Sequence, residues 1–254
     1  MKSVILLSVL AIAATVNGAS IASNSSNVNL GQALKDYYSS LKNVMPCGDA
    51  EINLPVLAPF RKELVPLNYT DKYFSIEGNF SNIYITGLDS YYFVRYDFNE
   101  KTNVFHIDMM LPQLQVVGNV DVGSFVSIGG FPLQWISDGL INMKLVDFRV
   151  VSSFRLANNA QGYLQESDVK MNFYLGDMIV NNWNKLWNIS GNNFFNKFLG
   201  EFIMMYSEQI QIEFNEIFNS FALPVINRSM EQLTQQEFIE QLRALTAKFN
   251  SVNC

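Results

Sequence analysis

The chain has 254 residues, of which 49% are hydrophobic and 16% are charged. This balance excludes a disordered protein and permits a large apolar core. The formal net charge of −6 argues against binding to nucleic acid or to an anionic membrane, because both require clustered Lys and Arg side chains.

The first residues, MKSVILLSVLAIAATVNGAS, have the order of a secretory signal peptide. Lys2 supplies the positive end, an apolar run follows, and small residues around Gly18 offer a cleavage site. A membrane anchor is the alternative, but the apolar run is short for a span and polar sequence follows at once. We therefore expect a cleaved signal at residues 1–18, a flexible Ser/Asn-rich segment at 19–29, and a secreted, extracellular protein without a transmembrane segment.

Secretion gives meaning to five Asn-x-Ser/Thr triplets, which are candidate glycosylation sites: Asn24, Asn68, Asn79, Asn188 and Asn227.

Secretion also permits the chain's two cysteines, Cys47 and Cys254, to form an internal disulfide. Free thiols or a covalent dimer through the terminal Cys254 are the alternatives. We expect a monomer.

The segment LGQALKDYYSSLKNV has apolar residues at helical spacing, which predicts a first helix over residues 30–44. Pro46 and Gly48 end it. The next segment, INLPVLAPFRKELVPL, contains three prolines, and proline removes a donor from a strand ladder. It is therefore predicted to be an extended edge or strap and not a central strand.

From about residue 72 to 175 the apolar period changes to two, as in NVFHIDMML and DVKMNFYL. This alternation is typical of antiparallel strands with one dry face. In LINMKLVDFRVV the apolar parity switches between Leu145 and Val146, which predicts a bulge and a bent sheet. GFPLQWISDG and LANNAQG are interpreted as turns.

The segment GNNFFNKFLGEFIMMYSEQIQIEFNEIFNSF, residues 191–221, is predicted to be a long helix. Its first half is apolar on every side, so a curled sheet is expected to wrap around it. A shorter amphipathic helix follows in LTQQEFIEQLRALTAKF, with Thr234 and Glu237 spaced as a capping box. We assign residues 226–254 to a C-terminal extension that carries this helix.

The order of these pieces resembles the insect takeout and juvenile-hormone-binding protein family, whose lipid-binding fold is shared with bactericidal permeability-increasing protein. The matching segments are INLPVLAPF, NIYITGLDSYYF, FHIDMMLPQLQVVGNVDVG and FYLGDMIVNNWNKLWN. The resemblance covers roughly residues 30–225. The chain departs from the family in lacking a cysteine pair before or at the first helix, so the family's disulfide cannot be transferred to Cys47.

The resemblance implies an α+β fold in which a highly curved antiparallel sheet wraps a long helix and encloses an elongated apolar cavity. It further implies a carrier of a small hydrophobic ligand such as a juvenile hormone-like terpenoid, a fatty acid or a pigment, with no enzyme activity and no cofactor. A secreted module that binds a lipid surface or a protein is the alternative. A solidly packed core would explain the same apolar residues.

The residues predicted to line the apolar wall come from both strands and helix: Phe105, Ile107, Met109, Met143, Met171, Phe173, Phe198, Phe202, Met205 and Tyr206. Polar anchors in such a pocket could come from side chains with a donor on an apolar body, namely Tyr37, Tyr38, Tyr206, Trp135 and Trp183. The single histidine, His106, shares a strand face with Asp108 and is predicted to be solvated and not a catalytic base. No metal-ligand spacing, P-loop or nucleophile elbow is present in the sequence.

Overall fold

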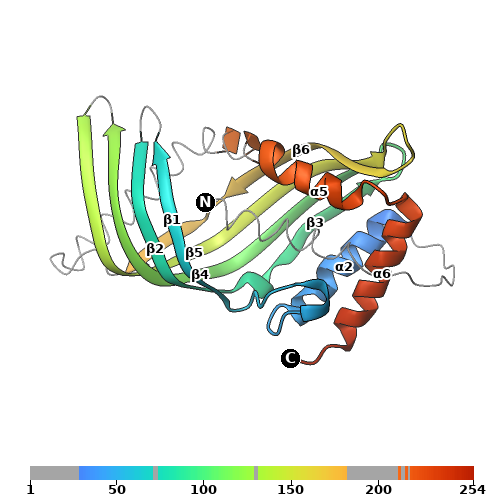
Figure 1. Ribbon diagram of the computed structural model, residues 1–254, viewed down its shortest axis with the longest axis horizontal. Helices are drawn as coiled ribbons and strands as arrows, with labels where there is room; N and C mark the ends of the chain where they lie inside the picture. The colour runs from blue at the N-terminus through green and yellow to red at the C-terminus, as the bar shows by residue number, and fades with distance from the viewer. Residues whose placement is uncertain (1–28, 71–73, 129–130, 182–210, 213–214, 217) are drawn as a thin grey trace.

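The computed structural model describes residues 29–70, 74–128, 131–181, 211–212, 215–216 and 218–254. Within these ranges the fold is α+β: a seven-stranded antiparallel sheet that is strongly curved and does not close on itself, with helices gathered at one end (Figure 1). The strands are β1 (Phe60–Thr70), β2 (Phe74–Thr86), β3 (Tyr92–Asn99), β4 (Val104–Ile128), β5 (Phe131–Asn158), β6 (Leu164–Tyr174) and β7 (Asp177–Asn181). The helices are α2 (Leu30–Val44), a π-helical turn (Phe218–Ala222), α5 (Leu223–Met230) and α6 (Gln235–Ser251), with short 3₁₀ turns at Ala50–Ile52 and Leu88–Ser90.

The β4–β5 hairpin is the spine of the sheet. Its strands of 25 and 28 residues pair without a register shift from Val104 opposite Arg155 to Ile128 opposite Phe131. Each half of the spine has its own neighbours: β2 and then β1 extend the half near the hairpin turn, and β3 pairs with the start of β4. On the other side of β5, β7 pairs near the middle of the strand and β6 near its end. The predicted edge position of the Pro-rich segment is confirmed, because β1 ends the sheet.

Two details of the strand prediction are wrong. Most of GFPLQWISDG belongs to β5 and not to a turn. The parity switch at Leu145/Val146 is not a bulge, because the register with β4 continues across it. Instead Asp147 adopts a left-handed backbone conformation, φ 52°. Opposite it on β4, the buried positions change from Leu111 to Leu114, so both strands switch parity together and the apolar face continues.

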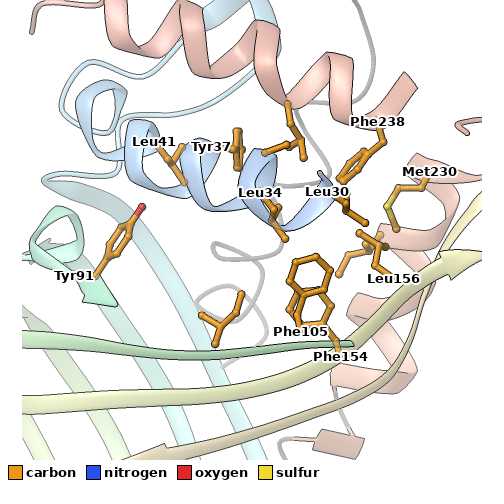
Figure 2. Packing of buried hydrophobic residues seen from close by; sticks show 14 of the residues in the cluster. Leu30, Leu34, Tyr37, Leu41, Tyr91, Phe105, Phe154, Leu156, Met230 and Phe238 are labelled. Atoms are coloured by element: carbon orange, nitrogen blue, oxygen red, sulfur yellow. The ribbon is translucent and has the colours of Figure 1, made fainter. Parts of the chain in front are cut away.

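Helix α2 spans the predicted residues because local signals define both of its ends. The Asn29 side chain accepts a hydrogen bond from the Gln32 backbone N–H at 2.8 Å and caps the start. Leu30, Leu34, Tyr37 and Leu41 are buried between the sheet and the C-terminal helices in one core cluster (Figure 2). Gly31 permits the close approach, since a Cβ there would lie 2.5 Å from a ring carbon of Phe98.

The free edge of β6 is covered by amide side chains from α5 and from the segment that leads into it. Asn215 accepts from the Met171 N–H and donates to the Met171 carbonyl, both at 2.7 Å. Asn227 makes the same pair of bonds with Glu166, at 2.7 and 3.0 Å. Gln211 donates to Phe173 O at 3.2 Å and Asn219 to Val169 O at 3.5 Å. These four amides, here called the amide ladder, replace a neighbouring strand.

Helix α6 packs beside α2 and is fixed at both ends. At its start Thr234 and Glu237 form the predicted capping box. At its end Cys254 is bridged to Cys47, so both cysteines of the chain are used within one molecule. Lys248 adds ion pairs to Asp49 and Glu51.

Two predictions about segment boundaries stay predictions. Residue 226, where we placed the start of a C-terminal extension, lies inside α5. Most of the predicted long helix at 191–221 and all of the predicted signal and flexible segment up to residue 28 lie outside the described residues.

Candidate functional site

One face of the curved sheet is apolar in rows that run across its strands. Directly opposed residues of antiparallel strands place their side chains on the same face, so the register defines each row. One row crosses five strands and contains only apolar residues: Phe60, Ile85, Val116, Met143 and Val180. The predicted wall residue Met143 lies in this row, between Val116 and Val180.

Three further rows continue this face beneath and beside α2. They read Phe93–Met109–Val150–Phe173, Tyr96–Ile107–Ser152–Met171, and Phe98–Phe105–Phe154. Both hydroxyls among them are satisfied, because Ser152 Oγ donates to the Ile107 carbonyl at 3.5 Å and Tyr96 Oη to the Gly31 carbonyl at 2.9 Å. The described wall residues Phe105, Ile107, Met109, Met143, Met171 and Phe173 therefore all lie on one face.

Burial separates these six residues into two groups. Phe105 is fully buried, with its ring between those of Phe98 and Phe154 at centroid distances of 4.4 and 4.9 Å. Ile107 is 4% exposed. Met109, Met143, Met171 and Phe173 are half-buried. The first group is packed by protein on all sides, whereas the second group retains surface that a ligand could contact.

Glu166 brings a carboxyl group onto the same face, and the sequence analysis did not single it out. It lies opposite Leu156, a core residue, and is itself 7% exposed. Asp168, with φ 56°, marks the irregularity in β6 that turns Glu166 toward this face together with Val169. Burial raises the pKa of Glu166 from 4.5 to about 7.

Tyrosine hydroxyls of α2, of β3 and of the turn before β3 are the other polar groups on the apolar side of the sheet. Tyr38 packs edge-on against Phe93, and desolvation followed by the Glu166 carboxylate raises its pKa well above the ordinary value. Tyr91 donates to the Tyr38 carbonyl and Tyr96 to the Gly31 carbonyl. Of the predicted anchors, Tyr37 is fully buried against Phe249 of α6. Tyr38 remains partly exposed.

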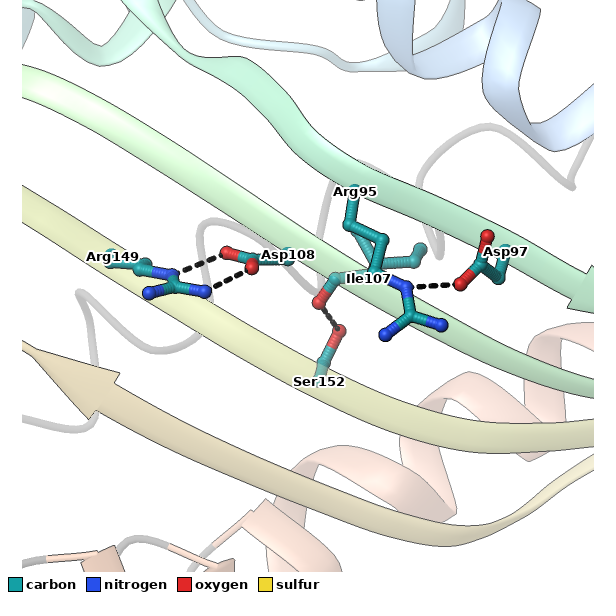
Figure 3. Close-up of polar contacts among 6 residues, drawn as sticks. All are labelled: Arg95, Asp97, Ile107, Asp108, Arg149 and Ser152. Atoms are coloured by element: carbon teal, nitrogen blue, oxygen red, sulfur yellow. Dashed lines mark hydrogen bonds and ion pairs between the residues drawn. The ribbon is translucent and has the colours of Figure 1, made fainter.

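The opposite face of the sheet is polar. Asp108 and Arg149 form a two-pronged ion pair across β4 and β5, and Arg95 pairs with Asp97 on β3 (Figure 3). The Arg149 hydrogen bond lowers the pKa of Asp108. His106 is exposed on this face, as predicted. A hollow of about 840 Å³ at the β3–β4 hairpin is lined by charged side chains, among them Arg95 and Lys101, together with His106 and the apolar Phe98 and Val104.

The remaining predicted residues are outside the described part of the chain: Phe198, Phe202, Met205, Tyr206, Trp183 and the sequons Asn24 and Asn188. The side chain of Trp135 is also outside it. Of the other sequons, Asn68 and Asn79 are exposed on β1 and β2.

Two absences hold for the described residues. They contain no group of three or more His, Cys, Asp or Glu side chains that could hold a metal ion. Among them no helix combines the length and the apolar character needed to cross a membrane.

Comparison with known proteins gives one sequence match and several structural ones. The family model of haemolymph juvenile hormone binding proteins matches residues 4–240. No protein of curated function matches the sequence. Among solved structures, Takeout 1 of Epiphyas postvittana is 14% identical, with 88% of this chain and 94% of that chain covered and a TM-score of 0.45. Lipopolysaccharide binding protein is 11% identical over 77% of this chain and 39% of that one, with a TM-score of 0.33.

The family match spans most of the chain, from the apolar start through the whole curved sheet and into α6. It agrees with the resemblance that the ordered motifs of the sequence predicted. The chain belongs to the haemolymph juvenile hormone binding protein family.

Proposed function

We propose that this protein is a secreted carrier that binds a small hydrophobic ligand against the apolar face of the sheet. The observation that carries the proposal is the set of predominantly apolar rows across the curved sheet, in which Met109, Met143, Met171 and Phe173 are only half-buried. Family membership supports the same function, since the family is named for binding a hydrophobic hormone.

The wall that we assign to the ligand is narrower than the sequence predicted. Phe105 and Ile107 are packed in the core, so we assign contact with the ligand to Met109, Met143, Met171 and Phe173. Methionine and phenylalanine suit ligands of variable outline, because the thioether chain is flexible and the ring offers a large apolar surface.

The expected affinity follows from the area buried. Each methylene group removed from water contributes ~0.8 kcal/mol, so a ligand with about 15 such carbons gains roughly 12 kcal/mol before the costs of association. Even half of that gain gives a dissociation constant of roughly 40 μM. The ligand class that these energetics favour is a long apolar molecule such as a terpenoid, a fatty acid or a pigment.

The first test is to extract the purified protein with organic solvent and to identify bound lipids by mass spectrometry. The second is displacement of an apolar fluorescent probe by terpenoids and fatty acids. A protein that carries no lipid, and whose probe none of these compounds displaces, would contradict the proposal. Binding of the protein to neutral vesicles without any small ligand would favour the surface-binding module instead.

A matched pair of variants tests the assigned face. Met109→Trp places a larger side chain on the apolar face, whereas Met110→Trp makes the same change one residue later, opposite Arg149 on the polar face. We expect the Met109 variant to weaken probe binding about tenfold. This is the effect of removing about two methylene groups of the probe from the apolar face. The Met110 variant should bind as the wild type does.

Secretion is part of the proposal and has its own test. Expression in insect cells followed by N-terminal sequencing of the medium should give a chain that begins near residue 19. A full-length chain retained in the cell would contradict the cleaved signal.

A further inference from the structure

The backbone of Glu166 is held in place by hydrogen bonds at Glu166 itself and at Leu164, two residues earlier. The Glu166 N–H and carbonyl bind the Asn227 amide of α5, and the Leu164 N–H donates to the Leu233 carbonyl at 2.7 Å. Leu164, Ile226 and Met230 nearby are 1–2% exposed. The backbone is therefore fixed, and the largely buried side chain extends from it on the face that it shares with Leu156.

Nothing in the described part of the chain satisfies this carboxyl group. Its side chain makes no hydrogen bond or ion pair there. From β5 it faces Leu156, and from α2 the group within electrostatic reach is the Tyr38 phenol. Arg228 of α5 and Glu231, which directly follows that helix, line a small outer hollow beside Gln165 and Asn227.

A buried carboxyl group without a partner weakens the fold, whether it is ionised or neutral. Leucine at this position would pack with Leu156 and Leu164 without that cost. Groups that are unfavourable for stability and perturbed in pKa concentrate at functional sites. A role in binding explains why a glutamate stands here.

We propose that Glu166 is the polar anchor of the ligand, and that the ligand carries an uncharged acceptor oxygen, as in an ester, ketone or epoxide, at one end of an apolar chain. This inference rests on the proposed carrier function. Met171, a residue of the assigned wall, lies on the same face five residues further along β6, about 16 Å of extended strand. A chain anchored at Glu166 therefore reaches the half-buried wall.

The protonated carboxyl group donates its hydrogen to the acceptor oxygen, in a site where water competes little. Burial, which raises the pKa of Glu166 to about 7, keeps that hydrogen in place in weakly acidic solution. Above this pH the ionised group has no hydrogen to donate. No cation among the described residues contributes to that pKa, so a fatty-acid anion is a poor occupant of the site.

The experiment compares methyl palmitate with hexadecane, two apolar chains that differ in one ester group, by probe displacement between pH 5.5 and 8.5. We expect the wild type to prefer the ester about tenfold at pH 5.5, the worth of one buried hydrogen bond, and to lose this preference at pH 8.5. Hexadecane binding should not change with pH. Glu166→Gln keeps an amide donor and should prefer the ester at every pH. Glu166→Leu should bind both chains equally.

The failures of the two proposals are distinguishable. If the wild type binds neither chain, the carrier function is wrong. If both chains bind but the Glu166→Leu variant retains the ester preference with its pH dependence, the anchor is wrong and the carrier function stands. Should the leucine variant not fold, the glutamine variant decides alone: an unchanged pH profile in it would overturn the proposal.

Discussion

Replacement of Asn215 by leucine is expected to destabilise the protein by breaking the amide ladder on the β6 edge. The Asn215 side chain makes three hydrogen bonds of 2.7 Å: one from the Met171 N–H, one to the Met171 carbonyl and one to the Gln211 carbonyl. Leucine is similar in size but leaves both backbone groups of Met171 without a protein partner. Each partly buried group left unpaired costs about 1–3 kcal/mol, so for two such groups we expect a loss of roughly 2–6 kcal/mol in the free energy of unfolding.

Urea unfolding followed by far-ultraviolet circular dichroism measures this loss. The matched control is Asn172→Leu on the adjacent residue of β6, whose side chain points to the other face. The ladder also predicts an order. Asn227→Leu should cost about as much as Asn215→Leu, since it too removes a donor and an acceptor, whereas Asn219→Leu should cost least because its single bond is 3.5 Å long. An Asn215 variant as stable as the Asn172 control would refute the ladder.

Three further predictions concern ionisable groups and the disulfide. Because the folded-state pKa of Glu166 is raised from 4.5 to about 7, its contribution is fully present below pH 4.5 and is lost as pH rises through 7. The free energy of unfolding of the wild type, measured by thermal unfolding, should therefore fall by about 3 kcal/mol between pH 4.5 and 7. That of the Glu166→Gln variant should not fall in this way. The pKa of Asp108 is lowered by Arg149, so its contribution is present above the unfolded pKa and is lost in acid as pH falls through the folded value; Asp108→Asn should remove that acid dependence. Replacing both Cys47 and Cys254 by serine opens a loop with a sequence separation of 207, and chemical unfolding should show a loss on the order of 5 kcal/mol.

The elements that the sequence predicted well are those defined by neighbours in the chain. Helix α2 begins and ends where predicted because its cap at Asn29 and its stop at Pro46 and Gly48 are local signals. The capping box at Thr234 and the alternation in β4 and β6 are local in the same sense. Periodicity also placed six wall residues on one face, since a strand's side chains alternate whatever its partners are.

The parts that failed depend on contacts between distant residues. Pro132 and Gly139 made GFPLQWISDG look like a turn, but pairing with β4 along its whole length keeps it in β5. The parity switch at Asp147 was interpreted as a bulge because the matching switch in β4 cannot be known before the two strands are aligned. Whether Phe105 is core or wall depends on α2 covering it, and periodicity does not contain that information.

Two features had a signal in the sequence that went unused. Gln211, Asn215 and Asn219 recur at intervals of four, which places them on one side of a helix, and Asn227 follows eight residues later. Such a row of amides among Phe and Ile residues indicates bonds to backbone. Glu166 stands two residues from Leu164, which by alternation puts it on the buried face, but three residues from Val169, which puts it on the exposed face. The irregularity at Asp168 lets Glu166 share the buried face with both.

The amide ladder also predicts that the sequon at Asn227 carries no glycan. A glycan is attached to the side-chain nitrogen of asparagine, and in Asn227 this nitrogen donates to the Glu166 carbonyl at 3.0 Å while the side-chain oxygen accepts from the Glu166 N–H. A sugar there would lie between α5 and β6 and would separate them. Asn68 and Asn79 are exposed on β1 and β2 and leave room for a glycan. We therefore expect peptide mass spectrometry of protein secreted by insect cells to find sugar at Asn68 or Asn79 and none at Asn227. The Asn227→Gln variant should migrate on a gel as the wild type does, yet unfold at lower urea because the longer side chain misplaces both hydrogen bonds. A glycan found at Asn227 in folded, ligand-binding protein would mean that α5 is not held to β6 by this amide, and the position of Glu166 beneath it would be wrong as well.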